Sequence, residues 1–388
     1  MKQLVYVMLF ITTSVFAKAA PNLQAIVDKH HEQYTDIEHF SAIQVSIKAN
    51  NELQHYTAGT VSREPNSKAV TPSHLFEIGS ITKSYTSALV MLADAEKKLG
   101  VSDQVKKYLN AYPDWGNLPL TRLLNMTSGL PNYSDSPTFN YLFSQNINQF
   151  WGEDELISLV YTRDEKPPLK EGYFYTNTGY ILLDMILSDQ YNQSFKDLLI
   201  KRIFKPLGLK NTYYPVPSYS PETLKHKVQG YSYNIYDNPE LVGKNVTLAN
   251  LSWGGAAGGI VANSEDVINW VDALFVNDKL LNKAQKHEMQ QLISVQSGKP
   301  IHQVDENDPR GFGLGIVSNY DKSFGQFWFY EGETFGYRSL YMHVPCNKVT
   351  IVALFNSGTN GENDHAGKLM TSLYGQLLKN NPPLQCKS

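Results

Sequence analysis

The sequence predicts an α+β fold in which an antiparallel sheet is flanked by helices and a mainly helical domain is inserted between its strands. Two observations support this class. Strand patterns occur near both ends of the chain, and the middle is rich in helical patterns and loops. No proline- or glycine-rich linker separates independent modules. We therefore expect a discontinuous sheet domain formed by residues 20–85 and 255–388, with residues 86–254 forming the inserted helical domain.

The sheet domain is expected to begin with a hairpin. Residues 42–48 and 55–61 have strand patterns, and Asn50-Asn51 supplies the turn between them. After Ser80, apolar side chains recur at helical spacing, so a helix is expected there that stops near Gly100.

The rest of the chain follows the same order of helices and then strands. Helices in the middle are expected over residues 120–125, 154–162, 180–187 and 195–204. An amphipathic helix over 265–281 comes next, and strands follow over 311–318, 326–330, 338–344 and 349–356. A final helix over 368–378 closes the chain.

Composition and charge exclude several classes of protein. The chain has 388 residues, and 34 Lys and Arg against 37 Asp and Glu give a net charge of −3. Because there is no cationic excess to displace counterions from phosphates, we expect no nucleic-acid partner. Hydrophobic residues make up 42% and charged residues 18%, which supplies a large core and excludes wholesale disorder.

The first residues are typical of a secretory signal peptide. Residues 4–17 are uncharged and mostly apolar, and Ala17-Lys18-Ala19 gives small residues at the positions that precede a cleavage site. A retained anchor is the alternative, but these 14 residues are fewer than the roughly 20 that a membrane span needs. Loss of the predicted signal peptide, residues 1–19, would leave a charge of −5 (32 − 37). We expect a secreted or periplasmic protein with no stable membrane span after cleavage.

The two cysteines are too few for a disulfide scaffold or for a Cys-based metal site. In an oxidising compartment Cys346 and Cys386 can pair and close a loop of 40 residues (386 − 346). The alternative is one buried thiol and one thiol in the C-terminal tail. Both remain open, because the sequence does not show whether the two Cα atoms come within about 7 Å.

Several kinds of site are excluded by their missing motifs. No His-Glu-x-x-His occurs, and the ten histidines are scattered apart from His30-His31, so no metal site is expected. The glycines of residues 311–315 have the wrong spacing for a dinucleotide loop, so no cofactor is expected. The chain has no Gly-x-Ser-x-Gly elbow, which argues against an α/β-hydrolase.

One Ser-x-x-Lys motif, Ser80-Ile81-Thr82-Lys83, starts the predicted helix. Residues three apart lie on one face of a helix, so the Lys83 amine can reach the Ser80 hydroxyl. A partly desolvated lysine, or a tyrosinate held beside one, can take the serine proton, and the helix N-terminus favours developing negative charge. By itself the motif is also compatible with an ordinary helix start.

A second element is needed to relay the proton and hold the substrate. Tyr175 and Asn177 can supply it, as a phenol that moves the proton and an amide that binds a substrate carbonyl and the lysine. A competing Tyr-x-Asn, residues 236–238, has no helix after it. The segment that starts at Asn177 leads into an apolar helix, so Tyr175 is the preferred candidate.

These motifs resemble those of the serine β-lactamase and penicillin-binding protein superfamily, specifically the class C β-lactamase-like branch. The likeness covers nearly all of residues 30–360. It rests on five ordered segments: residues 76–83 with the nucleophile, 123–130, 173–180 with the second motif, 204–212 and 256–260. The resemblance implies a β-lactamase/transpeptidase-like fold. The branch includes D-alanyl-D-alanine carboxypeptidases, D-aminopeptidases and carboxylesterases.

The third catalytic motif departs from the family pattern. The family carries Lys-Thr-Gly or His-x-Gly on an edge strand, and the matching triplet here is Tyr330-Glu331-Gly332. By resemblance, Gly332 would let substrate lie against the strand, and the backbone N–H groups of Ser80 and Glu333 would form the oxyanion hole. Tyr330 occupies the position of the family's cation, which a substrate carboxylate prefers. Arg338 would compensate for the missing cation if its side chain reached the cleft.

Three functional hypotheses follow. In the first, an exported serine hydrolase forms an acyl-enzyme at Ser80, Lys83 and Tyr175 move protons, and water releases the product. Its small-molecule or peptide substrate would be a D-amino-acid peptide, as for a D-alanyl-D-alanine carboxypeptidase, or a small ester. The second is a penicillin-binding or sensory protein of the same fold with little turnover. The third is a structural exported protein without catalysis.

Overall fold

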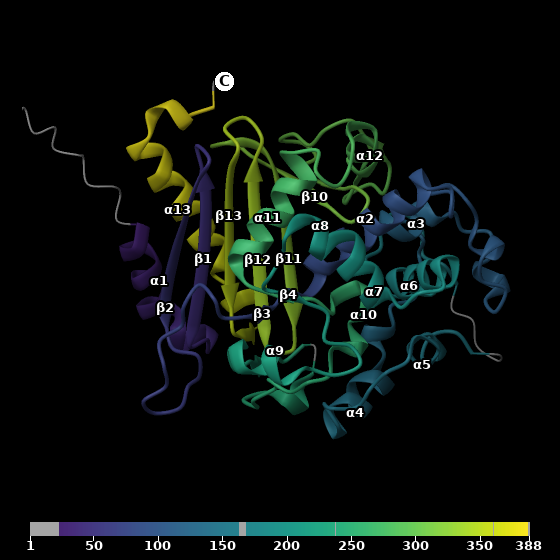
Figure 1. Ribbon diagram of the computed structural model, residues 1–388, viewed down its shortest axis with the longest axis horizontal. Coiled ribbons are helices and arrows are strands. Elements are labelled where there is room, and N and C mark those ends of the chain that lie inside the picture. The colour runs from purple at the N-terminus through teal and green to yellow at the C-terminus, as the bar shows by residue number, and fades with distance from the viewer. Residues whose placement is uncertain (1–22, 163–167, 237, 360, 387–388) are drawn as a thin grey trace, which may run out of the picture.

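The computed structural model describes residues 23–162, 168–236, 238–359 and 361–386 (Figure 1). The predicted signal peptide, residues 1–19, lies outside these described residues. In Figure 1, α1 and α13 lie on the left, the long strands run through the middle, and helices α3 to α7 gather on the right. The predicted α+β class, an antiparallel sheet flanked by helices with a helical insertion, is confirmed.

Within the described residues, the main sheet has nine strands in the order β2-β1-β13-β12-β11-β10-β9-β7-β8, all paired antiparallel. Its strands are β1 (Ala42–Ala49), β2 (Glu52–Gly59), β7 (Leu292–Ser294), β8 (Pro300–Ile301), β9 (Arg310–Phe312), β10 (Val317–Asp321), β11 (Gly325–Thr334), β12 (Tyr337–Val344) and β13 (Val349–Phe355). Because Ile43 of β1 pairs with Phe355 of β13, strands from the two ends of the chain form one sheet.

Short strands make two further small sheets. These strands are β3 (Phe76–Glu77), β4 (Thr212–Tyr213), β5 (Tyr231–Tyr233), β6 (Val261–Ala262) and β14 (Ser357–Thr359). The strand β6 pairs with both β3 and β4. Since β3 leads directly into the segment that carries Ser80, this small sheet fixes the approach to the predicted nucleophile.

The helices differ widely in length. The longer ones are α1 (Leu23–Glu38), α2 (Thr82–Ala95), α4 (Pro137–Gln145), α6 (Thr178–Tyr191), α11 (Ser264–Phe275), α12 (Lys283–Met289) and α13 (Ala366–Asn380). The shorter ones are α3 (Leu120–Leu124), α5 (Glu153–Ser158), α7 (Phe195–Leu199), a π-helical turn (Ile200–Phe204), α8 (Lys205–Leu207), α9 (Pro221–His226) and α10 (Gly255–Gly258). Among the described residues, none of these helices combines the length and apolar character needed to cross a membrane.

The two faces of the sheet bury separate cores. Helices α1 and α13 cover one face, and α2 and α11 pack in the core of the other. Successive residues of β13 serve the two sides, because Ile351 belongs to the core under α13 and Val352 to the core under α11. This alternation follows from the pleat of a strand, and it determines which side chains can reach the site.

The N-terminal hairpin and the helix after Ser80 form as predicted, but with different bounds. The second strand covers residues 52–59 rather than 55–61. Asn50 and Asn51 adopt φ angles of 51° and 64°, which a tight turn between two strands requires. The helix α2 ends at Ala95, before the expected stop at Gly100. Lys97 takes a left-handed φ of 58°, which no continuing helix allows.

Three elements are shorter or more broken than the pattern indicated. The helix expected over 154–162 ends at Ser158. The expected strand over 311–318 is interrupted, because the Gly313 N–H donates to the Ile316 carbonyl at 2.8 Å and makes a turn between β9 and β10. The helix expected over 265–281 ends at Phe275, where the N–H groups of Val276 and Asn277 both close onto the Asp272 carbonyl. Helix α1 was not predicted, and the domain boundaries at residues 85 and 255 stay a prediction.

Cys346 and Cys386 form a disulfide, with their Cα atoms 5.7 Å apart, so the alternative of two free thiols does not apply. The disulfide ties the end of the chain to the turn between β12 and β13.

We expect the double variant Cys346→Ser/Cys386→Ser to lose about 2–4 kcal/mol of unfolding free energy, because the unfolded chain gains conformational entropy when the cross-link is absent. Urea unfolding of the oxidised protein and the variant measures this difference, and equal midpoints would contradict it.

Candidate active site

Ser80 lies in a 3-10 turn, Gly79–Ile81, that leads into α2. Gly79 has a φ of +47°, and a Cβ atom on it would lie 2.6 Å from the backbone nitrogen of Glu333 in β11. A residue with a side chain would therefore be both strained and obstructed at this position. The turn and the strand consequently pack backbone to backbone beside the Ser80 hydroxyl.

The structure brings Ser80, Lys83 and Tyr175 together. The Lys83 amine donates to Ser80 Oγ at 2.9 Å, and the Tyr175 hydroxyl donates to the same atom at 2.7 Å. Tyr175 lies three residues before the start of α6, whereas the competing Tyr236 is 69% exposed at the surface. The oxygen of Ser80 is thus held between two groups that can accept or return its proton.

Lys83 is completely buried, and its environment suits a neutral amine. Burial lowers the pKa of Lys83, and the neighbouring Tyr175 opposes that shift. Its amine also donates to the Ala257 carbonyl oxygen at 2.9 Å and lies 4.9 Å from the centre of the Tyr175 ring. With one N–H directed to Ala257, a neutral amine can turn its lone pair toward the Ser80 hydroxyl.

Ala257 is a functional neighbour that sequence reasoning missed. Its segment, residues 256–260, matches the family pattern, but no site residue is predicted in it, and the contact uses a backbone oxygen. The helix α10 is held beside α2 by hydrogen bonds such as that from the Thr86 hydroxyl to the Ala256 carbonyl, at 2.6 Å. No side-chain pattern predicts which backbone carbonyl will accept a hydrogen bond from Lys83, so only the packing of α10 against α2 identifies Ala257.

Tyr330 lies behind Tyr175 rather than on an open surface. It is 4% exposed, and its hydroxyl is 3.4 Å from the Tyr175 hydroxyl. Burial and the nearby Tyr175 raise the pKa of Tyr330 well above that of a free phenol. At the position where the family carries a cation, this chain therefore has a neutral group that contacts the tyrosine of the site.

Gly332 and Glu333 meet the Ser80 segment through their backbones. A Cβ atom on Gly332 would lie 2.0 Å from the Ile78 carbonyl oxygen, so the strand can approach this segment only if the residue is glycine. The absence of a side chain at Gly332 is thus explained by packing against Ile78. The expected role of glycine in leaving room for substrate stays a prediction.

One edge of β11 is open beside the site. The pairing of β10 with β11 extends only to Trp328, whereas β12 pairs with β11 through Thr334. Beyond Trp328, the edge away from β12 has no partner strand among the described residues. Such an edge can offer backbone hydrogen bonds to an extended ligand.

Asn177 lies at the site but does not contact Lys83 as expected. Its side-chain nitrogen donates to Ser134 Oγ at 3.0 Å, and Lys83 takes the Ala257 carbonyl instead. The expected bond between Asn177 and the lysine is therefore not formed. The Oδ1 atom of Asn177 is buried and has no partner among the described residues, which leaves an acceptor available beside Tyr175.

A cavity of about 240 Å³ adjoins Tyr175 and Asn177. Its lining residues are Asn132, Ser134, Asp135, Asn140, Tyr175, Asn177, Trp253, Glu333, Thr334 and Phe335. This lining contains two acidic residues, Asp135 and Glu333, and no lysine or arginine among the described residues. Desolvation raises the pKa of Asp135. The pocket is therefore polar and, where Asp135 and Glu333 are ionised, negatively charged.

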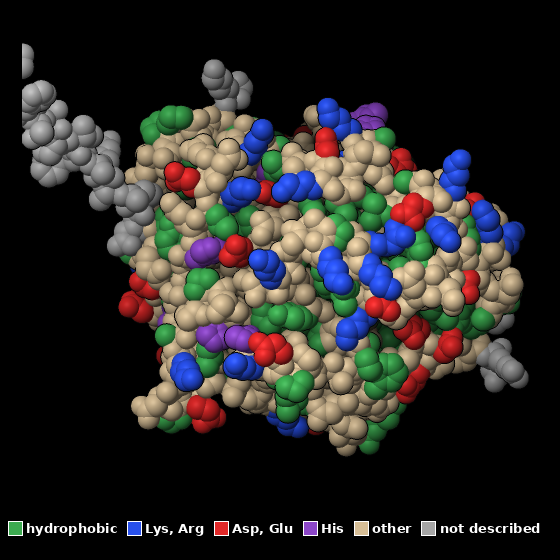
Figure 2. Space-filling model, viewed as in Figure 1, with side chains coloured by type: hydrophobic (Ala, Val, Ile, Leu, Met, Phe, Trp, Pro, Cys, Tyr) green, Lys and Arg blue, Asp and Glu red, His purple; other side chains and the backbone are tan. Residues whose placement is uncertain are grey.

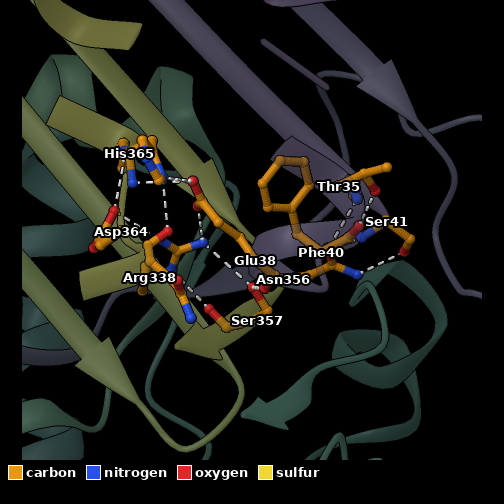
Figure 3. Close-up of polar contacts among 12 residues, drawn as sticks. Thr35, Glu38, Phe40, Ser41, Arg338, Asn356, Ser357, Asp364 and His365 are labelled. Atoms are coloured by element: carbon orange, nitrogen blue, oxygen red, sulfur yellow. Dashed lines mark hydrogen bonds and ion pairs between the residues drawn. The ribbon is translucent and has the colours of Figure 1, made fainter. Parts of the chain in front are cut away.

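Arg338 does not reach this cavity. Its guanidinium lies between the carboxylates of Glu38 and Asp364 (Figure 3), with N–O distances of 2.8 and 2.7 Å. Successive residues of β12 point to opposite faces, and it is Ser339 that bonds toward the site through the Ile78 carbonyl. The possibility that Arg338 replaces the missing cation is therefore wrong.

Glu331 interacts with the charged groups around Arg338 rather than with the pocket beside Ser80. Desolvation and then the Asp364 carboxylate raise the pKa of Glu331 to about 7. The negative charge that Glu331 adds to the triplet is thus coupled to the ion pairs of Arg338 with Glu38 and Asp364, called here the Arg338 network.

No group of three or more His, Cys, Asp or Glu in the described part of the chain is arranged to hold a metal ion.

Together, the mixed sheet-and-helix fold and the Ser-x-x-Lys turn beside β11 define a β-lactamase-like fold with a serine at its centre. The profile of the Beta-lactamase family matches residues 27–373, and the chain belongs to that family. Its relatives include serine hydrolases of several kinds.

Individual relatives are distant. Penicillin-binding protein 4* of Bacillus subtilis is 24% identical over 334 residues, which cover 84% of this chain and 70% of that protein. The teichoic acid D-alanine hydrolase of Staphylococcus aureus is 26% identical over 165 residues, or 42% of this chain and 38% of that protein. The solved D-amino acid amidase of Ochrobactrum anthropi, in complex with L-phenylalanine, superposes with a TM-score of 0.76 at 22% identity over 93% of this chain and 98% of that one.

Proposed function

We propose that the protein is an exported serine hydrolase that forms an acyl-enzyme at Ser80. One observation carries the proposal: the Ser80 oxygen lies within hydrogen-bond distance of both Lys83 and Tyr175, at 2.9 and 2.7 Å. A serine in contact with a buried amine and a phenol has the groups needed to transfer an acyl group without a histidine. The disulfide between Cys346 and Cys386 supports export, since disulfides persist in oxidising compartments.

The reaction uses the contacts in order. The Ser80 proton passes to the neutral Lys83 amine while Oγ bonds to the substrate carbonyl carbon. The backbone N–H groups of Ser80 and Glu333 then stabilise the oxyanion, as the packing of Gly79 against Glu333 supports. The proton passes through the Tyr175 hydroxyl to the leaving nitrogen or oxygen, the bond to the leaving group breaks, and water hydrolyses the ester.

The charge of the pocket bears on the substrate. Among the described residues that line it there is no cation, while Asp135 and Glu333 are acidic. A substrate carboxylate would be repelled there, whereas a free ammonium group would be attracted. We therefore favour an ester or amide of a D-amino acid with a free amine over a carboxypeptidase substrate. Relatives named teichoic acid D-alanine hydrolase and D-amino acid amidase support this choice.

The second candidate is a penicillin-binding or sensory protein that is acylated but turns over little. Tyr330 in place of the family's cation favours it, because substrate affinity would be weakened. The two candidates differ in what happens after acylation. A labelled penicillin that marks Ser80 and is never released, together with no hydrolysis of any ester or amide, would support the second candidate.

One panel of substrates tests the proposal. D-Alanine p-nitroanilide, its N-acetyl derivative and N-acetyl-D-alanyl-D-alanine differ in the charge they bring to the pocket. We expect kcat/KM for the free amine to exceed that of its acetyl derivative at least about tenfold, or ~1.4 kcal/mol. Intact mass spectrometry of quenched reactions should show an acyl adduct that disappears in Ser80→Ala.

The controls separate the chemistry from the preference. Asp135→Asn should reduce the ratio between the free and acetylated amines without abolishing the adduct. Faster cleavage of the acetylated or carboxylate substrate would end the amine preference and leave the acyl-enzyme standing. Unchanged turnover in Ser80→Ala would overturn the whole proposal.

A further inference from the structure

A second cavity lies apart from the Ser80 pocket and is larger. It has a volume of about 610 Å³ and is formed by α7, the π-helical turn, α8 and the segment from Leu209 to Thr223. It shares no lining residue with the cavity beside Tyr175. Its volume falls in the range of about 300–1,000 Å³ that small-molecule sites occupy.

The floor of this cavity is apolar. Phe204, Leu209 and Tyr214 line it and are each 5% exposed. Tyr214 is held by an edge contact with Phe195, at 5.3 Å between ring centres. An apolar chain or ring would replace water on this surface favourably.

The rim of the cavity is cationic. Lys196, Lys205 and Lys210 line it, and no aspartate or glutamate does among the described residues. Lys205 and Lys210 are exposed and take part in no ion pair within the described part of the chain. Asp266, whose carboxylate is influenced by the charge of Lys210, accepts hydrogen bonds from the Asn211 N–H and the Thr212 hydroxyl.

Cationic side chains also cluster on the surface around α7 and α8. In Figure 2, Lys and Arg side chains gather near the middle of the face on which Figure 1 draws α7 and α8. The whole chain has a net charge of −3, so a rim lined by lysines alone is a local departure from the rest of the protein. The Lys196 amine donates to the Val216 carbonyl at 3.3 Å, and Lys205 and Lys210 form no ion pair with the described residues. Lysines around an apolar floor complement a molecule with an apolar body and an anionic head.

We propose that this cavity is a binding site for an amphipathic small-molecule anion, a single aliphatic or aryl chain that ends in a carboxylate. The chain lies on Phe204, Leu209 and Tyr214, and the carboxylate lies among Lys196, Lys205 and Lys210. The site does not depend on the hydrolase activity, because its lining residues are separate from those around Ser80.

Binding of dodecanoate to the Ser80→Ala protein tests this proposal without interference from acylation. Isothermal titration below the micellar concentration should give one saturable site, and 1-dodecanol, which has no charge, should bind at least about tenfold more weakly. The pair Lys205→Gln/Lys210→Gln should weaken dodecanoate about tenfold. The pair Lys279→Gln/Lys283→Gln removes the same charge from exposed lysines elsewhere and should leave the affinity unchanged.

A variant of the floor keeps the test independent of charge. Leu209→Trp fills the cavity and should weaken dodecanoate at least about tenfold, with circular dichroism confirming that the variant is folded. If it does not fold, the lysine pair and the dodecanol comparison still decide the question. The absence of saturable binding, or equal binding by the wild-type rim and the Lys205/Lys210 variant, would overturn the proposal.

Discussion

Replacing Lys83 with methionine is expected to lower kcat/KM for an activated ester by about 10²–10⁴-fold, because the Ser80 hydroxyl loses the buried amine that accepts its proton. Methionine keeps the length and apolar stem of lysine, so the packing inside the site is largely preserved. The burst of acyl-enzyme, followed by stopped-flow absorbance, should slow by the same factor. This separates a slower chemical step from weaker binding.

The pH profile gives a second measurement of the same prediction. Burial lowers the pKa of Lys83, so the neutral amine is available at lower pH than for a lysine in water. The rate should therefore rise with pH through the shifted pKa, and Lys83→Met should lose that limb of the profile. Lys98→Met, at an exposed lysine just after α2, should change neither rate nor profile. An unaltered burst in Lys83→Met would show that Tyr175 alone takes the proton.

Replacing Arg338 with methionine is expected to cost about 3–5 kcal/mol of unfolding free energy, because the buried carboxylate of Glu38 loses its guanidinium partner and keeps the contacts from His365. Glu38 is fully buried, and desolvation raises its pKa even with the guanidinium in contact. The Arg338 network also joins α1 to the start of α13 through Asp364 (Figure 3). Urea unfolding measures the loss.

Two comparisons make this second prediction specific. Arg202→Met breaks an ion pair with Glu96 that is partly exposed, and should cost less than about 1 kcal/mol. The double variant Glu38→Gln/Arg338→Met removes both charges and should recover part of the stability. Folded Arg338→Met should keep kcat/KM within about threefold of wild type. A large loss of activity at unchanged stability would contradict this prediction and indicate that Arg338 contacts the substrate.

Much of the site was predictable because its chemistry is carried by side chains at short spacing. Ser80 and Lys83 lie three residues apart at the start of one helix, and helical geometry alone brings their side chains together. Tyr175 is 95 residues further along the chain. It was predicted from its motif and from the apolar helix that follows it, not from any rule of spacing.

The parts that were not predictable depend on backbone atoms and on the side of a strand. The Ala257 carbonyl that binds Lys83 has no side-chain signature, and the expected bond from Asn177 to Lys83 gave way to Ser134. The expected role of Gly332 in leaving room for substrate stays a prediction, and the structure adds a second constraint, because a Cβ atom there would clash with the Ile78 carbonyl. Each of these is decided by a contact between segments that lie far apart in the chain.

The amino-acid sequence by itself predicted the fold class and the pairing of Ser80 with Lys83, because hydrophobic period and local spacing are properties of neighbouring residues. It predicted Tyr175 from its motif and from the apolar helix that follows. Only the tertiary structure decided the pairing of Cys346 with Cys386, the direction of Arg338 and the charge of the cavity beside Tyr175. These depend on which strands are adjacent and on which face each residue of a pleated strand presents. No pattern within one segment records either of them.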